Sequence, residues 1–181
     1  MLSLEKIYEK FEAKGDFLQA SELNSGHINN TYLVETKEGK PNYVLQQINH
    51  KVFPDIPALM QNKILVSQYL KNNSRQNQVH LQFIKAYSGQ YFYKDQTDYY
   101  WNMMEHIPNS KVLEKTENTQ QAKEAGRGFG GFISALHNFD ASQLHEVIKD
   151  FHKMSFRFEE FDHALKNAQT SYKDNAKKKR I

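Results

Sequence analysis

Residues 25–34 have the sequence SGHINNTYLV, in which a polar turn runs directly into a β-prone segment. Residues 17–23 before the turn and 31–35 at its end both have strand character, so the turn connects two neighbouring strands. Successive short polar residues can leave backbone N–H groups pointing into one concavity, and such concavities bind anions. The turn is therefore a candidate phosphate-binding loop, with a plain hairpin turn as the alternative. The candidate binding residues are Ser25, Gly26, His27, Ile28, Asn29, Asn30 and Thr31.

The segments around this turn predict a strand-rich first part of the chain. Residues 43–48 (YVLQQI) form a third strand after a tight connection that contains Gly39 and Pro41. Pro54 and Pro57 then open a helix whose inner face is marked by Leu59, Met60, Ile64, Ser67 and Leu70. Three more strands are expected over residues 81–86, 90–95 and 98–104, and further helices over about residues 3–14, 118–137 and 155–169.

This order of elements predicts two lobes. Strands concentrate before residue 105 and helices after it, which indicates an α+β architecture with a join near Glu105 to Ser110. We expect an antiparallel-sheet N-lobe over residues 1–105, a hinge or linker over 106–112, the start of a helical C-lobe over 113–170 and a basic tail over 171–181.

A glycine cluster at residues 126–131 (GRGFGG) fits the G-x-G-x-x-G pattern of many phosphate loops. In dinucleotide-binding folds that pattern follows a strand and opens a helix. Here helix-prone residues precede the glycines and FISALH follows in helical phase, so the cluster is expected inside a helix. Each glycine there costs about 1 kcal/mol relative to alanine. Close packing against a neighbouring helix, through Gly126 and Gly130, is the expected compensation.

Composition and charge narrow the function classes. The chain has 181 residues, no cysteine and a net charge of +3. The last eleven residues contain five basic residues and one acid, which leaves the preceding 170 with a net charge of −1. No basic and aromatic patch in the body supports nucleic-acid binding. No signal peptide or membrane span is evident. A cytoplasmic protein that does not contact a membrane is the default expectation.

Five segments together resemble a known family. They are SGHINNTYLV (25–34), YVLQQINHKVF (43–53), ALMQN (58–62), YYWNMMEHIPNS (99–110) and, more weakly, FHKMSFRF (151–158). They are similar to the N-acetylhexosamine 1-kinase-like branch of the aminoglycoside phosphotransferase and choline kinase superfamily, from near the N-terminus to about Leu165. The resemblance implies a protein-kinase-like fold with ATP and Mg²⁺ as cofactors. It also implies phosphorylation of a small molecule, in this branch the anomeric hydroxyl of an amino sugar.

Carried over by position, the resemblance assigns roles to residues of this chain. Residues 25–31 would form the loop over the ATP phosphates, with His27 a candidate for direct contact. The carbonyl of Glu105 would accept from the adenine amino group, and the N–H of Ile107 would donate to the adenine ring. Kinases place a phosphate-binding lysine on the third strand. Here Gln46 has that place, with Gln47 as the register alternative. For the acid expected on the following helix, Asn62 is the nearest candidate.

The catalytic machinery of the superfamily is not found in the sequence. Its H-x-D-x-x-x-x-N loop supplies the base, and a later aspartate supplies a metal ligand. A D-x-x-x-x-N does occur from Asp162 to Asn167, but Glu160 stands where the histidine would be and the segment is in helical phase. No zinc-like histidine spacing is present either. We therefore assign no catalytic and no metal-binding residue, and we expect the metal ligands outside this chain.

Two classes of function remain open. In the first, the chain is the ATP-binding portion of a sugar kinase of this superfamily, or of a relative acting on choline, homoserine or an aminoglycoside. In the second, it is a non-catalytic kinase-like interaction module. A truncated C-lobe would expose apolar faces at Phe151, Phe156 and Phe161, which favours self-association or a second chain as partner.

Overall fold

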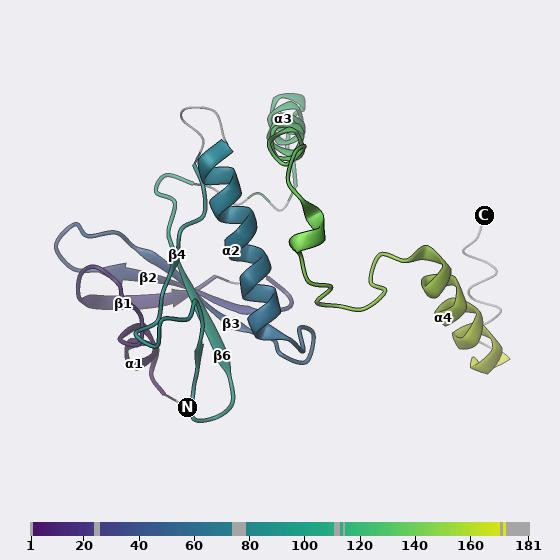
Figure 1. The fold of residues 1–181 in the computed structure, drawn as a ribbon, viewed down its shortest axis with the longest axis horizontal. Helices are drawn as coiled ribbons and strands as arrows, with labels where there is room; N and C mark the ends of the chain where they lie inside the picture. The colour runs from purple at the N-terminus through teal and green to yellow at the C-terminus, as the bar shows by residue number, and fades with distance from the viewer. Residues whose placement is uncertain are drawn as a thin grey trace. The chain divides into compact units, whose positions relative to one another are not determined.

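The computed structural model describes residues 2–23, 26–73, 79–110, 113, 115–170 and 172. These residues fall into two compact units, Met1–Val147 and Ile148–Ile181. Figure 1 shows the first unit as a sheet with helices and the second as a helical segment. Each unit is described by itself below.

The first unit is built on one six-stranded antiparallel sheet. The strand order is β1-β2-β3-β6-β4, and β5 also pairs with β6. Because β3 pairs with β6, the sheet joins segments more than 50 residues apart. The bounds of β1, β2 and β3 lie within one residue of the expected segments, and β6 begins two residues later than expected. Strands β4 and β5 each occupy only two residues of their expected segments. The bounds are β1 Phe17–Glu22, β2 Asn30–Thr36, β3 Tyr43–Ile48, β4 Phe83–Ile84, β5 Tyr93–Lys94 and β6 Tyr100–Glu105.

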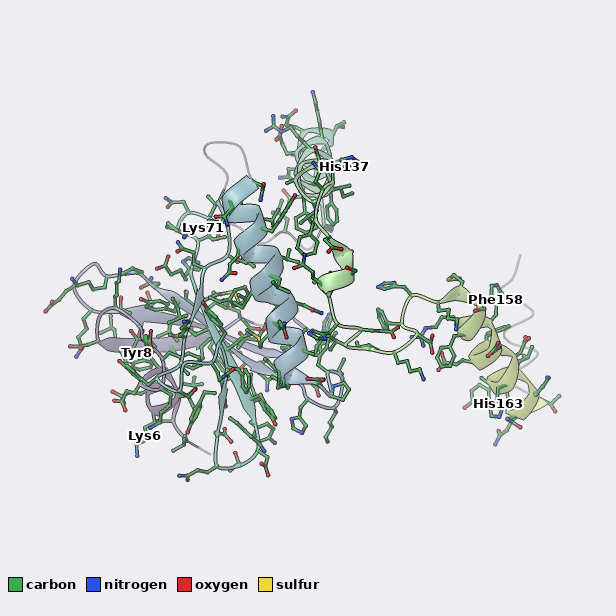
Figure 2. The ribbon with its side chains drawn as sticks, viewed as in Figure 1. Lys6, Tyr8, Lys71, His137, Phe158 and His163 are labelled. Carbon is green, nitrogen blue, oxygen red and sulfur yellow. The ribbon has the colours of Figure 1, made fainter. Side chains whose placement is uncertain are left out.

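Side chains along β3 and β6 alternate between the two faces of the sheet, because successive side chains of a strand point to opposite faces. Each face carries its own apolar layer. On one face, Leu45 and Met103 belong to the larger core cluster, together with Ile7 and Tyr8 of helix α1 (Leu4–Tyr8). Tyr8 is among the residues that Figure 2 labels. On the opposite face, Ile48 packs with residues of helix α2. Each large apolar side chain that is fully buried in these layers contributes about 1.5–3 kcal/mol.

Helix α2 (Ile56–Asn73) packs on the second face of the sheet through Ile56 and Met60. Local interactions determine where the helix starts, and Pro54 and Pro57 predicted this start from the sequence. The Asp55 carboxylate accepts a hydrogen bond from the Ala58 N–H at 2.9 Å, and Pro57 occupies the first turn, where a missing N–H costs nothing.

Helix α1 ends earlier than expected. The predicted helix reached Lys14, whereas α1 stops at Tyr8. Beyond it, Phe11 forms a β-bridge with Ala86, and the Glu12 N–H donates to the Lys85 carbonyl at 2.8 Å. Pairing with the strand region buries Phe11 almost completely, and this tertiary contact overrides the helical periodicity.

The remaining helices lie where the sequence predicted them. Helix α3 (Thr119–Ala135) starts at Asn118, whose side chain accepts from the Gln121 N–H at 2.9 Å. Helix α4 (Met154–Asn167) lies in the second unit. Neither helix has a buried residue among those that the structure describes. Phe151 and Phe161 are exposed, as expected, whereas Phe156 is half-buried. Among those residues, no helix combines the length and hydropathy needed to cross a membrane.

Candidate functional site

A cavity of about 830 Å³ lies on the α2 side of the sheet within the first unit. Strands β3, β4 and β6 contribute Gln46, Phe83 and Met104 to its lining, and α2, residues 79–81, α3 and Leu144 supply the rest. Small-molecule sites usually measure about 300–1,000 Å³ and are mostly apolar with a few placed polar groups. This cavity has that size and that character.

The polar part of the cavity is a short chain of hydrogen bonds from the β2 end of the turn to α2. The Gln46 Nε2 donates to Thr31 Oγ1 at 3.3 Å. The Lys63 Nζ lies 3.5 Å from Gln46 Oε1, to which it donates a long hydrogen bond. Thr31 and Gln46 are also cross-strand partners, so the contact is fixed by the register of β2 on β3. The candidate phosphate loop therefore ends beside Gln46, which in turn contacts Lys63.

Lys63 is the cationic group of the cavity wall on α2. Among the residues that the structure describes, no carboxylate lies within ion-pairing distance of its ammonium group. Burial lowers the pKa of Lys63 from its ordinary value, because removing water penalises the charged form. The site thus holds a partly desolvated cation whose described neighbours are neutral.

The two adjacent glutamines of β3 face opposite sides of the sheet, and only one of them faces the cavity. Gln46 lines the cavity, whereas Gln47 is only 7% exposed and accepts from Asn30 Nδ2 at 2.7 Å. Since neighbouring residues of a strand face opposite sides, only one of the two can point toward α2. Gln46 is therefore the glutamine of β3 that faces the cavity.

Asn62 does not have the place expected for it. Its side chain pairs with the backbone of His145, and the α2 residue that contacts Gln46 is Lys63. The sequence contained a signal for this, because Lys63 lies in one helical stripe with Met60, Ser67 and Leu70. The apolar pattern of the sequence predicted Ile64, and not the lysine, in that stripe.

The turn itself is held by its own polar side chains. The Asn29 Oδ1 accepts from the Asn49 N–H at 2.9 Å, and the Asn30 amide is bonded to Gln47. Gly26, His27 and Ile28 are exposed, while Ser25 lies outside the described residues. The asparagines therefore order the turn, and its exposed part is residues 26–28.

The expected hinge follows β6 directly. The Glu105 N–H donates to the Gln82 carbonyl at 2.9 Å, and the next N–H, of His106, donates to the Asn42 carbonyl at 2.8 Å. The Ile107 carbonyl accepts from Ser110 Oγ at 2.7 Å. Met104, just before Glu105, lines the cavity, whereas Glu105 and Ile107 are not among its described lining residues. The hinge thus lies at the cavity's border, one residue beyond its wall.

The glycine cluster lies inside α3, as predicted, but does not pack as predicted. A Cβ added at Gly126, Gly128 or Gly130 would meet no atom within 4 Å. The expected close helix contact through Gly126 and Gly130 is therefore absent among the described residues. Gly128 and Gly131 instead line the cavity.

No metal site is found in the part of the chain that the structure describes, where no three His, Asp or Glu side chains converge. Asp162 is an exposed residue of α4, as its helical phase indicated. The arrangement can bind an uncharged or anionic small molecule, but it offers no described group placed as a catalytic base.

The fold is shared with a small-molecule kinase. The chain superimposes on the crystal structure of the spectinomycin phosphotransferase APH(9)-Ia, in complex with ADP and spectinomycin, with a TM-score of 0.54. The match covers 92% of this chain and 47% of that chain at 11% sequence identity. This chain thus spans about half the length of that enzyme and has the antiparallel-sheet N-lobe of a kinase-like fold. No protein-family model matches the sequence.

Proposed function

We propose that this chain is the nucleotide-binding portion of a small-molecule phosphotransferase. The observation that carries the proposal is the cavity between β3 and α2, which meets the end of the turn at residues 26–31 through Thr31 and Gln46. The same fold accommodates ADP and a small-molecule acceptor in the spectinomycin enzyme.

In this proposal each element of the site takes one part of the nucleotide. Backbone N–H groups of the exposed turn and the side chain of Gln46 face the phosphates. The Glu105 carbonyl and the Ile107 N–H face the adenine edge. Mg²⁺ would neutralise charge between the β- and γ-phosphates when bound. No described residue is placed to hold Mg²⁺, so the proposal assigns neither its ligands nor the catalytic base to the described residues.

The acceptor that the sequence resemblance favours is the anomeric hydroxyl of an N-acetylhexosamine, in a cytoplasmic enzyme. An aminoglycoside, choline or homoserine is the alternative acceptor within the same superfamily. The residues that would contact the acceptor lie mostly in the second lobe of such enzymes, so the present site argues for the nucleotide and not for the sugar.

Calorimetric titration of the chain with ADP and ATP, with and without Mg²⁺, tests the nucleotide site. We expect saturable binding of both nucleotides and competition between them. An absence of binding at millimolar nucleotide would overturn the proposal. Following phosphate transfer to N-acetylhexosamines, choline and an aminoglycoside then identifies the acceptor.

A second candidate is an interaction module without catalysis. It is favoured by the exposed apolar residues of α3, where Phe129, Phe132 and Ile133 are 73%, 48% and 66% exposed. Such a patch on a short helix is typical of a protein interface. Concentration-dependent sedimentation without nucleotide binding would favour the module, whereas a monomer that binds ADP would favour the enzyme.

A further inference from the structure

We propose that Lys63 of α2 contacts the nucleotide's phosphates, in the role that kinases give to a lysine on the third strand. The inference rests on the proposed nucleotide-binding function and adds to it the source of the positive charge. The usual kinase arrangement is a lysine on the strand paired with a glutamate on the following helix. In this chain the two positions hold Gln46 and Lys63, so the cation is on the helix.

The geometry places the ammonium group where such a lysine would act. The Nζ of Lys63 lies 3.5 Å from Oε1 of Gln46, and both residues line the cavity. The Nε2 of Gln46 contacts Thr31, the last residue of the turn. A phosphate held by the turn would therefore lie near the end of the Gln46 side chain, within reach of a lysine that has a flexible four-carbon stem.

The surroundings of Lys63 are those of a cation that lacks its counterion. Its neighbours in the cavity wall include Val66, Phe83 and Met104, which offer no charge. Burying an unpaired ammonium group is costly, and proteins rarely do so without a partner. The described residues supply no carboxylate, and a phosphate anion would satisfy this requirement. The lowered pKa of Lys63 is consistent with the same desolvation.

A purely structural role makes a different prediction. If Lys63 only covers apolar surface with its stem, methionine should replace it without affecting ligand binding, because the two side chains have similar length and apolar volume. Nucleotide affinity therefore separates the two roles, provided that the phosphate and adenine contributions are measured separately.

The test compares Lys63→Met with Lys71→Met. Lys71 lies near the exposed C-terminal end of the same helix (Figure 2). Each variant removes one positive charge from α2, but only Lys63 lines the cavity. ADP and adenosine are titrated into both variants and into the unmodified chain. We expect Lys63→Met to weaken ADP binding about tenfold or more while adenosine binding changes less than about twofold. Lys71→Met should bind both ligands as the unmodified chain does.

The outcomes separate this inference from the function on which it rests. If the unmodified chain binds no ADP, the nucleotide function fails and the inference fails with it. If the chain binds ADP and Lys63→Met binds it equally well, only the inference is wrong. Equal loss of ADP and adenosine binding would indicate a structural role and would also overturn it.

An exchange variant tests the same point in a different way, and it serves if Lys63→Met does not fold. In Gln46→Lys/Lys63→Gln the cation returns to the strand and the amide moves to the helix, with the net charge unchanged. We expect this double variant to bind ADP within about threefold of the unmodified chain, since the charge stays at the same place in the cavity. Loss of ADP binding in the folded double variant would contradict the assignment.

Discussion

Asn62 and the backbone of His145, 83 residues further along the chain, form a reciprocal pair of hydrogen bonds. The Asn62 Nδ2 donates to the His145 carbonyl at 2.8 Å, and the His145 N–H donates to Asn62 Oδ1 at 2.9 Å. The His145 Nε2 also lies 2.9 Å from Gln61 Oε1, within hydrogen-bonding distance. These contacts attach the segment after α3 to α2 and so fix one side of the cavity wall at Leu144.

Replacing Asn62 by alanine should release this segment. Two hydrogen bonds of this kind contribute about 1–2 kcal/mol together, because each replaces a bond to water. We expect Asn62→Ala to raise the rate of proteolytic cleavage within residues 138–147, while the sheet keeps its protection against hydrogen exchange. Asn73→Ala is the control, since Asn73 only donates to the Tyr69 carbonyl within the same helix. Equal cleavage rates in the two variants would contradict the role of Asn62.

Asp95 organises the tight turn between β5 and β6. Its Oδ1 accepts from the Thr97 N–H, the Thr97 hydroxyl and the Tyr99 N–H, and its Oδ2 accepts from Trp101 Nε1 at 2.9 Å. Burial acts to raise the pKa of Asp95, but the hydrogen bonds from Trp101, Thr97 and Tyr99 outweigh burial and hold the pKa below its ordinary value.

Asp95→Asn should therefore destabilise the chain by about 1–3 kcal/mol, because a neutral amide replaces a charge-assisted acceptor. Since the folded pKa is the lower one, the stabilisation from Asp95 is complete above the ordinary carboxyl pKa. It is lost as the pH falls through the folded value. Urea unfolding at pH 7 and at acid pH measures both effects. Asp98→Asn is the matched control, because the Asp98 side chain forms an exposed ion pair with Lys94. A loss of stability in Asp95→Asn no larger than that in the control would contradict the role given to Asp95.

Local patterns predicted most of the fold. Strand alternation and turn residues located β1, β2, β3 and β6, and the proline pair located the start of α2. Helix α1 shows the limit of such patterns, since Leu4, Ile7, Tyr8 and Phe11 have helical spacing. Phe11 nevertheless lies outside the helix and forms a β-bridge with Ala86, which is 75 residues further along the chain. No local pattern in the sequence indicates this partner.

The candidate site was predicted less completely than the fold. The turn and Gln46 were identified from the strand pattern and the family resemblance. Lys63 was not selected, because the helical pattern placed Ile64 on the inner face of α2 in its stead. Only the register of β3, together with the placement of α2 on that face of the sheet, shows that this lysine meets Gln46.

Tyr8 should make stability depend on pH at alkaline values. Its hydroxyl donates to the Gly15 carbonyl at 2.7 Å, and its ring is buried in the larger core cluster. Burial first, and then the neighbouring Tyr43, Asp16 and Tyr87, raise the pKa of Tyr8 to about 12 from an ordinary value of 10.0. The unfolded chain therefore releases the phenol proton at a lower pH than the folded chain does.

The stabilisation that this proton provides is complete below about pH 10 and is lost as the pH rises through about 12. We expect the unfolding free energy to fall by on the order of 1–2 kcal/mol over that range, as seen in urea titrations at pH 9 and pH 12. Tyr8→Phe should lower stability at pH 9 and flatten part of this dependence. Tyr172→Phe, which alters an exposed tyrosine, is the control. A dependence as steep in Tyr8→Phe as in the control would contradict the assignment.

The last prediction concerns the glycines of α3. It tests whether Gly126 and Gly130 pack closely against another surface. Gly126 and Gly130 lie in the interior of an α-helix, and a Cβ at either position meets open space. Alanine restricts the unfolded chain more than glycine does and fits the same helical backbone. Gly126→Ala and Gly130→Ala should therefore each stabilise α3 by about 0.5–1 kcal/mol.

Thermal unfolding followed by far-ultraviolet circular dichroism measures this gain, with Gly39→Ala as the contrasting variant. Gly39 has a φ of 64°, so alanine there should destabilise the connection between β2 and β3 although its Cβ also meets open space. Destabilisation by Gly126→Ala or Gly130→Ala would show that another surface packs closely against α3. That result would restore the contact first inferred from the sequence and would place a partner on the helix.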